Sequence, residues 1–195
     1  GDTRAKDTTL YLAQAPIYVA DKSCDLQSLM ADIEVPSFIP KDRLREVCFW
    51  ASPTQTKASL HYDAMHGLLC VISGTKTVCL LPPSADVPTR SLAASSPNHS
   101  SLSFDAAMHR PDALCARLCA GDVLFIPEGW WHMVHSTPGT FAVNYWFGGA
   151  SARMKASRLA PFYARELVGS LVLADIQHQC QQWRDGHTAP DHAPS

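Results

Sequence analysis

A histidine, an aspartate and a second histidine interrupt an otherwise apolar stretch of the sequence, "SLHYDAMHGLL" at residues 59–69. In a buried strand such ionisable groups are costly unless they are paired, hydrogen-bonded or bound to a metal. Residues two apart in a strand point to the same side, so we predict that His61 and Asp63 project together while Tyr62 faces the opposite way. An imidazole and a carboxylate at this spacing can occupy neighbouring positions on one metal ion.

A third ligand for such an ion must come from a separate strand. The segment "GDVLFIPEGWWHMVHS", residues 121–136, offers His132 just after a turn, where a barrel strand would return toward the mouth. Two histidines and one carboxylate form the facial triad of non-heme Fe(II) oxygenases, which leaves coordination positions open. An isolated H-x-D pair is common by chance, and a histidine after a strand usually has a structural role. The surrounding elements must therefore support the assignment.

Short strand patterns separated by turn signals occupy most of the first 150 residues. Residues 84–112, rich in Ser, Ala and Pro, are predicted to be a long surface excursion, and apolar spacing predicts a helix over residues 21–33. Strands in series with helices mainly at the ends indicate a mainly β fold, a barrel or sandwich with helical flanks. The strands are predicted at residues 8–20, 47–50, 58–64, 67–73, 76–83, 113–119, 121–127, 130–136 and 140–147.

Composition gives no sign of a strongly charged partner. The net charge is -2, so the chain as a whole carries no nucleic-acid or anionic-membrane signature. The seven cysteines are scattered, and Cys70 and Cys79 lie in apolar strand patterns as small hydrophobes, which favours free thiols in a reducing compartment. No apolar run is long enough to cross a membrane. We therefore expect an intracellular protein of the cytoplasm or nucleus.

Three separated motifs resemble the Jumonji C family of the cupin superfamily, the Fe(II)- and 2-oxoglutarate-dependent oxygenases. "LHYDAMHGLLCVISGTKTVCLLPP" resembles the first metal-binding segment of the family, "GDVLFIPEGWWHMVHS" its second, and "FAVNYWF" its closing strand. The resemblance extends from about Tyr11 to Gly149 and is strongest to the small hydroxylases of the factor-inhibiting-HIF and wybutosine-tRNA hydroxylase group. It implies a double-stranded β-helix, the jelly-roll or cupin barrel, flanked by N-terminal and C-terminal helices.

The resemblance also implies roles for individual residues. It assigns the catalytic Fe(II) to His61, Asp63 and His132. Lys76 matches the lysine that holds the distal carboxylate of 2-oxoglutarate, and a buried dianion does need a fixed cation. Tyr11 matches a tyrosine that assists with the same carboxylate, and Asn144 matches a polar residue lining the cosubstrate site. Read without the family, Lys76 could be a solvated turn residue, and Tyr11 and Asn144 could be ordinary core and strand-end residues.

Two positions depart from the family pattern, which often has an asparagine at residue 67 and a threonine at residue 58. This chain has Gly67 and Ala58 there, and we expect Ser59, on the same face as His61, to supply the missing hydroxyl. Four further residues near the motifs are expected to have packing or surface roles: His66, His135, Trp130 and Trp131.

The function implied by the resemblance is hydroxylation of a protein side chain or a tRNA base, with decarboxylation of 2-oxoglutarate to succinate and carbon dioxide. Demethylation of N-methyl-lysine begins with the same hydroxylation, so it is an alternative within the same superfamily. A third possibility, from another class, is a cupin-fold binding module that has lost catalysis. The substrate partner, protein or tRNA, is not identified by the motifs.

The expected domain organisation has three parts. Residues 1–150 form the catalytic barrel, residues 151–186 a helical extension, and residues 187–195 a disordered tail. The extension carries an apolar stripe, which must pack on the barrel or against a second copy of the chain. The resemblance favours the second arrangement, a homodimer through C-terminal helices. The stripe consists of Leu159, Phe162, Tyr163, Leu167, Leu171, Val172 and Ile176.

Overall fold

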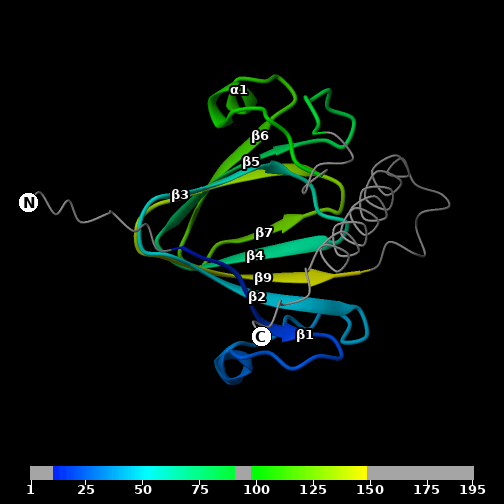
Figure 1. Ribbon diagram of the computed structural model, residues 1–195, viewed down its shortest axis with the longest axis vertical. Helices are drawn as coiled ribbons and strands as arrows, with labels where there is room; N and C mark the ends of the chain where they lie inside the picture. The colour runs from blue at the N-terminus through cyan, green and yellow to red at the C-terminus, as the bar shows by residue number, and fades with distance from the viewer. Residues whose placement is uncertain (1–10, 91–97, 149–195) are drawn as a thin grey trace, which may run out of the picture.

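The computed structural model describes residues 11–90 and 98–148, which form nine strands in two antiparallel sheets (Figure 1). The five-stranded sheet has the order β1 (Leu12–Val19), β2 (Leu44–Ser52), β9 (Thr140–Phe147), β4 (His66–Ser73) and β7 (Val123–Ile126). The four-stranded sheet has the order β3 (Thr56–His61), β8 (Trp131–Ser136), β5 (Thr75–Leu81) and β6 (Leu114–Cys119). Most successive strands lie in opposite sheets, as the predicted cupin barrel requires. All nine predicted strands are present.

The space between the sheets holds an apolar cluster and, beside it, several buried polar side chains. Alternating residues of the strands point inward, and their apolar members form a buried cluster between the sheets. The same inward faces carry buried Lys76, His132, Ser136 and Asn144, which line a cavity beside this cluster. The apolar cluster therefore fixes the barrel, and the cavity is the candidate site. The cluster consists of Leu69, Val71, Val78, Leu80, Leu118, Ile126 and Ala142.

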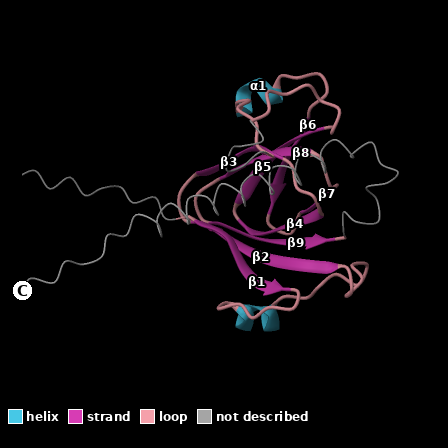
Figure 2. Cartoon of the chain, turned by 45° about the vertical axis from the view of Figure 1, so that its right-hand side comes forward, coloured by secondary structure: helices cyan, strands magenta, loops and turns pink. Residues whose placement is uncertain are grey.

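The described parts of the segment predicted as a surface excursion, residues 84–90 and 98–112, contribute to a core on the outer face of the four-stranded sheet. Within it, α1 (Phe104–Met108) begins at Ser103, whose hydroxyl accepts a hydrogen bond from the Ala106 N–H. Figure 2 shows α1 over this sheet. Side chains of the segment complete an apolar core with the outward residues of the sheet, so tertiary packing has ordered a stretch of low sequence periodicity. This core contains Leu60, Tyr62, Cys79, Leu81, Val87, Ala107, Trp131 and Met133.

The helix expected over residues 21–33 is only the six-residue 3-10 helix η1 (Gln27–Asp32). Its N-terminus has no side-chain cap, and its apolar residues Leu29 and Met30 pack on the outer face of the five-stranded sheet. Two tight turns are enough to place these side chains. The second expected helical flank, residues 151–186, and the tail, residues 187–195, lie outside the described residues, so the homodimer stays a prediction.

Two further expectations concern the cysteines and membranes. Cys79 of β5 and Cys115 of β6 lie directly opposite in register and are joined as a disulfide, whereas the sequence favoured free thiols. Adjacent strands bring these residues together, although the residues are far apart in sequence. Within residues 11–90 and 98–148, no helix is long and apolar enough to cross a membrane.

Candidate metal centre

The register between β3 and β8 brings two histidines face to face. His61 is the last residue of β3 and pairs directly with His132 of β8. A bulge lies between Ala58 and His61, where β3 contains one more residue than β8. Because of this extra residue, Ala58 and His61 both line the cavity although they are three apart. β3 ends at His61, so Asp63 reaches the site from the following loop. The sequence instead predicts Asp63 within a strand over residues 58–64.

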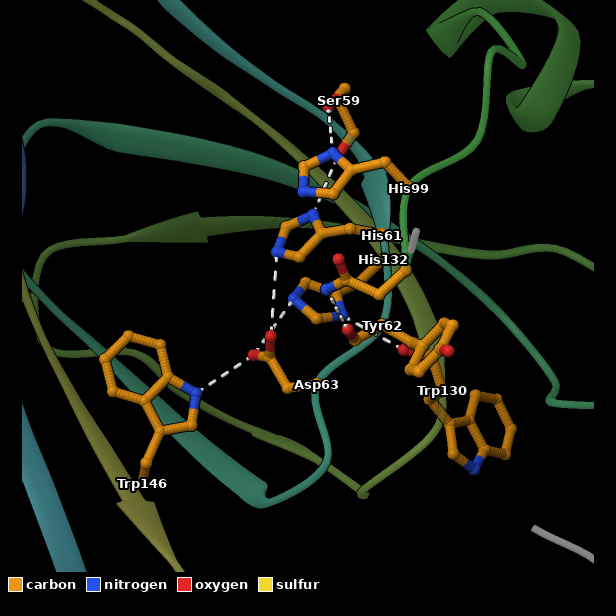
Figure 3. Close-up of polar contacts among 9 residues, drawn as sticks. Ser59, His61, Tyr62, Asp63, His99, Trp130, His132 and Trp146 are labelled. Carbon is orange, nitrogen blue, oxygen red and sulfur yellow. Dashed lines mark hydrogen bonds and ion pairs between the residues drawn. The ribbon is translucent and has the colours of Figure 1, made fainter. Parts of the chain in front are cut away.

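The three predicted ligands lie close enough together to share one ion. Single ligand atoms from His61, Asp63 and His132 all lie within 4.8 Å of one another. The His61 Nε2 is 3.9 Å from the Asp63 Oδ1, and the His132 Nε2 is 3.6 Å from the Asp63 Oδ2. Figure 3 shows both rings directed at the carboxylate. Tyr62 points away into the apolar core, as predicted.

Hydrogen bonds fix the state of each ligand. The Nδ1 of His61 lies 2.7 Å from the Ser59 carbonyl oxygen, and the Nδ1 of His132 lies 3.0 Å from that of Trp130. A carbonyl only accepts, so each Nδ1 carries a proton, and the neutral form of each ring then has on Nε2 the lone pair that a metal needs. Burial lowers the pKa of His132, which keeps that ring neutral. Trp146 Nε1 donates to the Asp63 Oδ2 at 2.9 Å and orients the carboxylate.

This donor set fits a divalent iron centre. Two neutral imidazoles and one carboxylate are the ligands of the facial triad, and their second partners are already in place. The three ligands would hold an ion from one side, so the other side of the ion would be accessible from a cavity of about 500 Å³.

Lys76 provides a cation deep in the same cavity. Its side chain extends from β5, the residue is 3% exposed, and its Nζ donates a hydrogen bond to the Ser136 Oγ at 2.8 Å. None of the ion pairs found in the described part of the chain includes Lys76. Burial without a counter-charge lowers the pKa of Lys76 to about 8. The reading of Lys76 as a solvated turn residue is therefore excluded by its burial.

The other predicted cosubstrate residues also line this cavity. Tyr11 packs beside Trp50, and burial raises the pKa of its hydroxyl, which stays protonated and able to donate. Asn144 is buried on β9, opposite Leu69 of β4 and two residues along the register from the Gly67 pair. A Cβ built on Gly67 would lie 3.6 Å from the Asn144 Oδ1, so the Asn144 amide fills space that a side chain at residue 67 would share.

Ser59 has a different place from the one expected. It occupies the bulge at the exposed edge of the cavity, and its hydroxyl bonds to His99 Nδ1 at 2.8 Å. The hydroxyl next to Lys76 comes instead from Ser136. Ala58 holds the inward position opposite Val134, so the missing threonine hydroxyl is not replaced from β3 at this point.

Three contributors to the site were missed from the sequence: His99, Ser136 and Trp146. His99 comes from the supposed surface excursion, and its ring stacks on His61 with centroids 5.0 Å apart. Ser136 and Trp146 could have been found from period-two spacing, because they lie four and two residues from His132 and Asn144 on their strands. No local pattern distinguishes His99.

The four residues expected in packing or surface roles do not line the cavity. His66 accepts a hydrogen bond from the Glu128 N–H, and His135 stacks on Phe104 outside the barrel. Trp131 is buried edge-on against Tyr62, and Trp130 packs beside the apolar cluster between the sheets.

A jelly-roll barrel with two histidines and an aspartate on the wall of its cavity defines a mononuclear metal centre of the cupin class. Residues 2–152 match the family described as the cupin-like domain, and the chain belongs to this family, among its Jumonji C members. Similar proteins include lysine-specific demethylase JMJ31 of Arabidopsis thaliana, 34% identical over an alignment of 187 residues that covers 87% of this chain and 34% of that protein.

Two further relatives have related descriptions. tRNA wybutosine-synthesizing protein 5 of Gallus gallus is 31% identical over 137 residues, covering 66% of this chain and 42% of that protein. Jumonji C domain-containing protein 5 of Drosophila melanogaster is 28% identical over 159 residues, covering 74% of this chain and 38% of that protein. The chain thus spans well under half the length of these relatives.

Proposed function

We propose that this chain is an Fe(II)- and 2-oxoglutarate-dependent dioxygenase that hydroxylates a protein side chain or a tRNA base. The observation that carries the proposal is the presence of two complementary groups in one cavity. One is the ligand set of His61, Asp63 and His132, and the other is the buried Lys76 ammonium. A ligand that chelates the metal and carries a distant carboxylate satisfies both, and 2-oxoglutarate has this form.

The residues around Lys76 suit a carboxylate. Lys76 supplies the charge, Ser136 holds the Lys76 Nζ in place, and the Tyr11 hydroxyl and Asn144 amide provide further donors on the cavity wall. A charge-assisted hydrogen bond is shorter and stronger than a neutral one, particularly when water is excluded. These residues would therefore fix the orientation of 2-oxoglutarate and leave its oxo-acid end directed at the ligand set.

Iron(II) in this site would supply the activation of dioxygen that is coupled to decarboxylation of 2-oxoglutarate to succinate and carbon dioxide. The chain itself holds both imidazole lone pairs and the Asp63 carboxylate in position through three hydrogen bonds. Leu69, Ile126 and Val134 form an apolar wall of the cavity, which limits water near the reacting groups.

The direct test is succinate release by purified chain supplied with Fe(II), ascorbate and 2-oxoglutarate in air. We expect turnover that stops when a chelator removes iron and returns when Fe(II) is added back. A chain that binds Mn(II) and 2-oxoglutarate but releases no succinate would instead be an inactive cupin-fold binding module.

N-methyl-lysine demethylation is the second candidate, because the relative JMJ31 is described as a lysine-specific demethylase. The iron site serves both reactions, so the products must separate them. A hydroxylated product retains one added oxygen, whereas demethylation removes a methyl group and releases formaldehyde. Mass spectrometry of the product together with a formaldehyde assay distinguishes the two.

A further inference from the structure

A short segment within the long excursion, residues 98–100, is bonded to the strand that carries His61 and to the residue after it. The Tyr62 N–H donates to the Asn98 carbonyl at 3.2 Å, and the Ser100 N–H donates to the Leu60 carbonyl at 2.8 Å. The Asn98 side chain adds a bond to the Tyr62 carbonyl at 2.8 Å. This pairing places His99 directly beside His61.

Ser59 holds both of these imidazoles. Its carbonyl accepts from the His61 Nδ1 at 2.7 Å, and its hydroxyl bonds to the His99 Nδ1 at 2.8 Å. The two rings are nearly parallel, with an interplanar angle of 15°, and Figure 3 shows them stacked between Ser59 and Asp63. The bulge makes this possible, because the extra residue of a bulged strand is not used in the ladder.

The second nitrogen of His99 is available for a ligand. Its Nδ1 is engaged by Ser59, and no residue in 11–90 or 98–148 makes a hydrogen bond to its Nε2. His99 is half-buried and lines the same cavity as the metal ligands. Its neighbours on the lining, Ser59 and Lys57, are exposed, whereas Lys76 is buried at the far end. His99 therefore stands between the mouth of the cavity and the ligand His61.

We propose that His99 is a specificity-determining residue, whose Nε2 hydrogen-bonds a polar group of a macromolecular substrate next to the carbon that is oxidised. This inference rests on the proposed function, since it concerns the substrate of that reaction. 2-Oxoglutarate occupies the Lys76 end, so a substrate group must approach the metal from the His99 side. An imidazole fixed at two points loses little freedom on binding, which favours selective recognition.

Two substitutions separate this role from simple support of His61. His99→Phe keeps a flat ring against His61 but removes the hydrogen bond, and His99→Gln restores a polar side chain. His109→Phe is the matched control, because His109 is exposed outside the cavity and bonds only to its own helix. Mn(II) affinity is measured by electron paramagnetic resonance. Succinate release is measured with and without total tRNA or a tryptic peptide pool.

We expect one pool to stimulate succinate release by the wild-type chain. His99→Phe should reduce that stimulation about tenfold, as loss of one hydrogen bond of about 1.4 kcal/mol would do. Mn(II) affinity should change less than twofold, His99→Gln should recover part of the stimulation, and His109→Phe should match the wild type.

The inference is overturned if His99→Phe keeps the stimulation, if neither pool stimulates the wild type, or if Mn(II) affinity falls as much as stimulation does. The last result would make His99 a support for His61 only. A wild-type chain that releases no succinate under any condition would instead contradict the proposed function, so the two failures are distinguishable.

Discussion

The two ends of the cavity handle charge in opposite ways. At the metal end, the Trp146 N–H donates to the Asp63 carboxylate and partly satisfies its charge, while the His61 and His132 Nε2 atoms lie 3.9 Å and 3.6 Å from its oxygens. At the other end, the Lys76 ammonium has one neutral hydroxyl as its partner and a lowered pKa of about 8. The metal end is preorganised because a hydrogen bond holds each ligand, whereas the Lys76 end stores an unfavourable charge that a bound anion would relieve.

Breaking the metal end should have the largest effect. His132→Ala removes a ligand that Trp130 holds in the correct tautomer, and we expect succinate release to fall more than about a hundredfold, because an incomplete triad binds iron weakly. Turnover and metal content are measured together, with circular dichroism to confirm folding. His135→Ala, on the outward side of the same strand, is the control. Wild-type turnover in His132→Ala would exclude the triad.

Breaking the Lys76 end should change binding and stability in opposite directions. Lys76→Met should weaken 2-oxoglutarate binding by about 2–5 kcal/mol, as expected for loss of one partner of a buried charge pair. The same change removes an uncompensated buried charge, so the unliganded chain should gain about 1–3 kcal/mol of stability. Calorimetric titration of the Mn(II)-loaded chain and urea unfolding measure the two effects. A loss of both affinity and stability would show that Lys76 is a structural residue.

The pKa of Lys76 also predicts how pH affects this end. The folded pKa is about 8, below the unfolded value of 10.5, so between these values the unfolded chain binds the extra proton. The contribution of Lys76 to stability therefore rises as pH increases from about 8 to about 10.5. Binding of 2-oxoglutarate requires the charged form, so affinity should be full below pH 8 and fall up to tenfold per pH unit above it. Titrations between pH 7 and 9.5 test this, and the decline should be absent in Lys76→Met.

The smallest expected effect sharpens the account of the metal end. Trp146→Phe keeps a flat ring but removes the hydrogen bond to Asp63, and we expect Mn(II) affinity to fall about tenfold, as is common when an outer partner of a ligand is lost. Trp130→Phe serves as the control, because Trp130 supports His132 through its backbone carbonyl only. Equal affinities in both variants would mean that Asp63 is oriented without the indole.

The sequence predicted this site well where its residues follow strand periodicity or a motif. His61, Asp63, His132 and Lys76 all lie where the motifs place them, and the nine strands follow apolar alternation. Two-residue alternation failed at β3 because of the bulge: Ala58 holds the inward position opposite Val134, and Ser59 lies at the exposed edge of the cavity. The threonine that the family often has at residue 58 is three residues from His61, and this odd spacing could have predicted the bulge.

His99 could not be predicted in the same way. Its position depends on pairing between β3 and a segment almost 40 residues later, within an excursion whose sequence has no periodic pattern. Long-range backbone bonds of this kind are decided by how the whole barrel packs. The 3-10 helix and the covering of the outer sheet faces are the same kind of result, because tertiary contacts and not local propensity determine them.

The bulge at Ser59 also governs how β3 tolerates changes in length. Ser59 and Leu60 together oppose a single residue of β8, so a chain with one residue fewer at this point would have an even ladder. In that shorter strand Ala58 and His61 would still face the cavity, and the metal ligands would stay in register. Without Ser59, however, the residue whose carbonyl bonds to His61 and whose hydroxyl bonds to His99 would be lost. We therefore expect some relatives to be one residue shorter here with the metal site unchanged, and those proteins must hold the mouth of the cavity by other means.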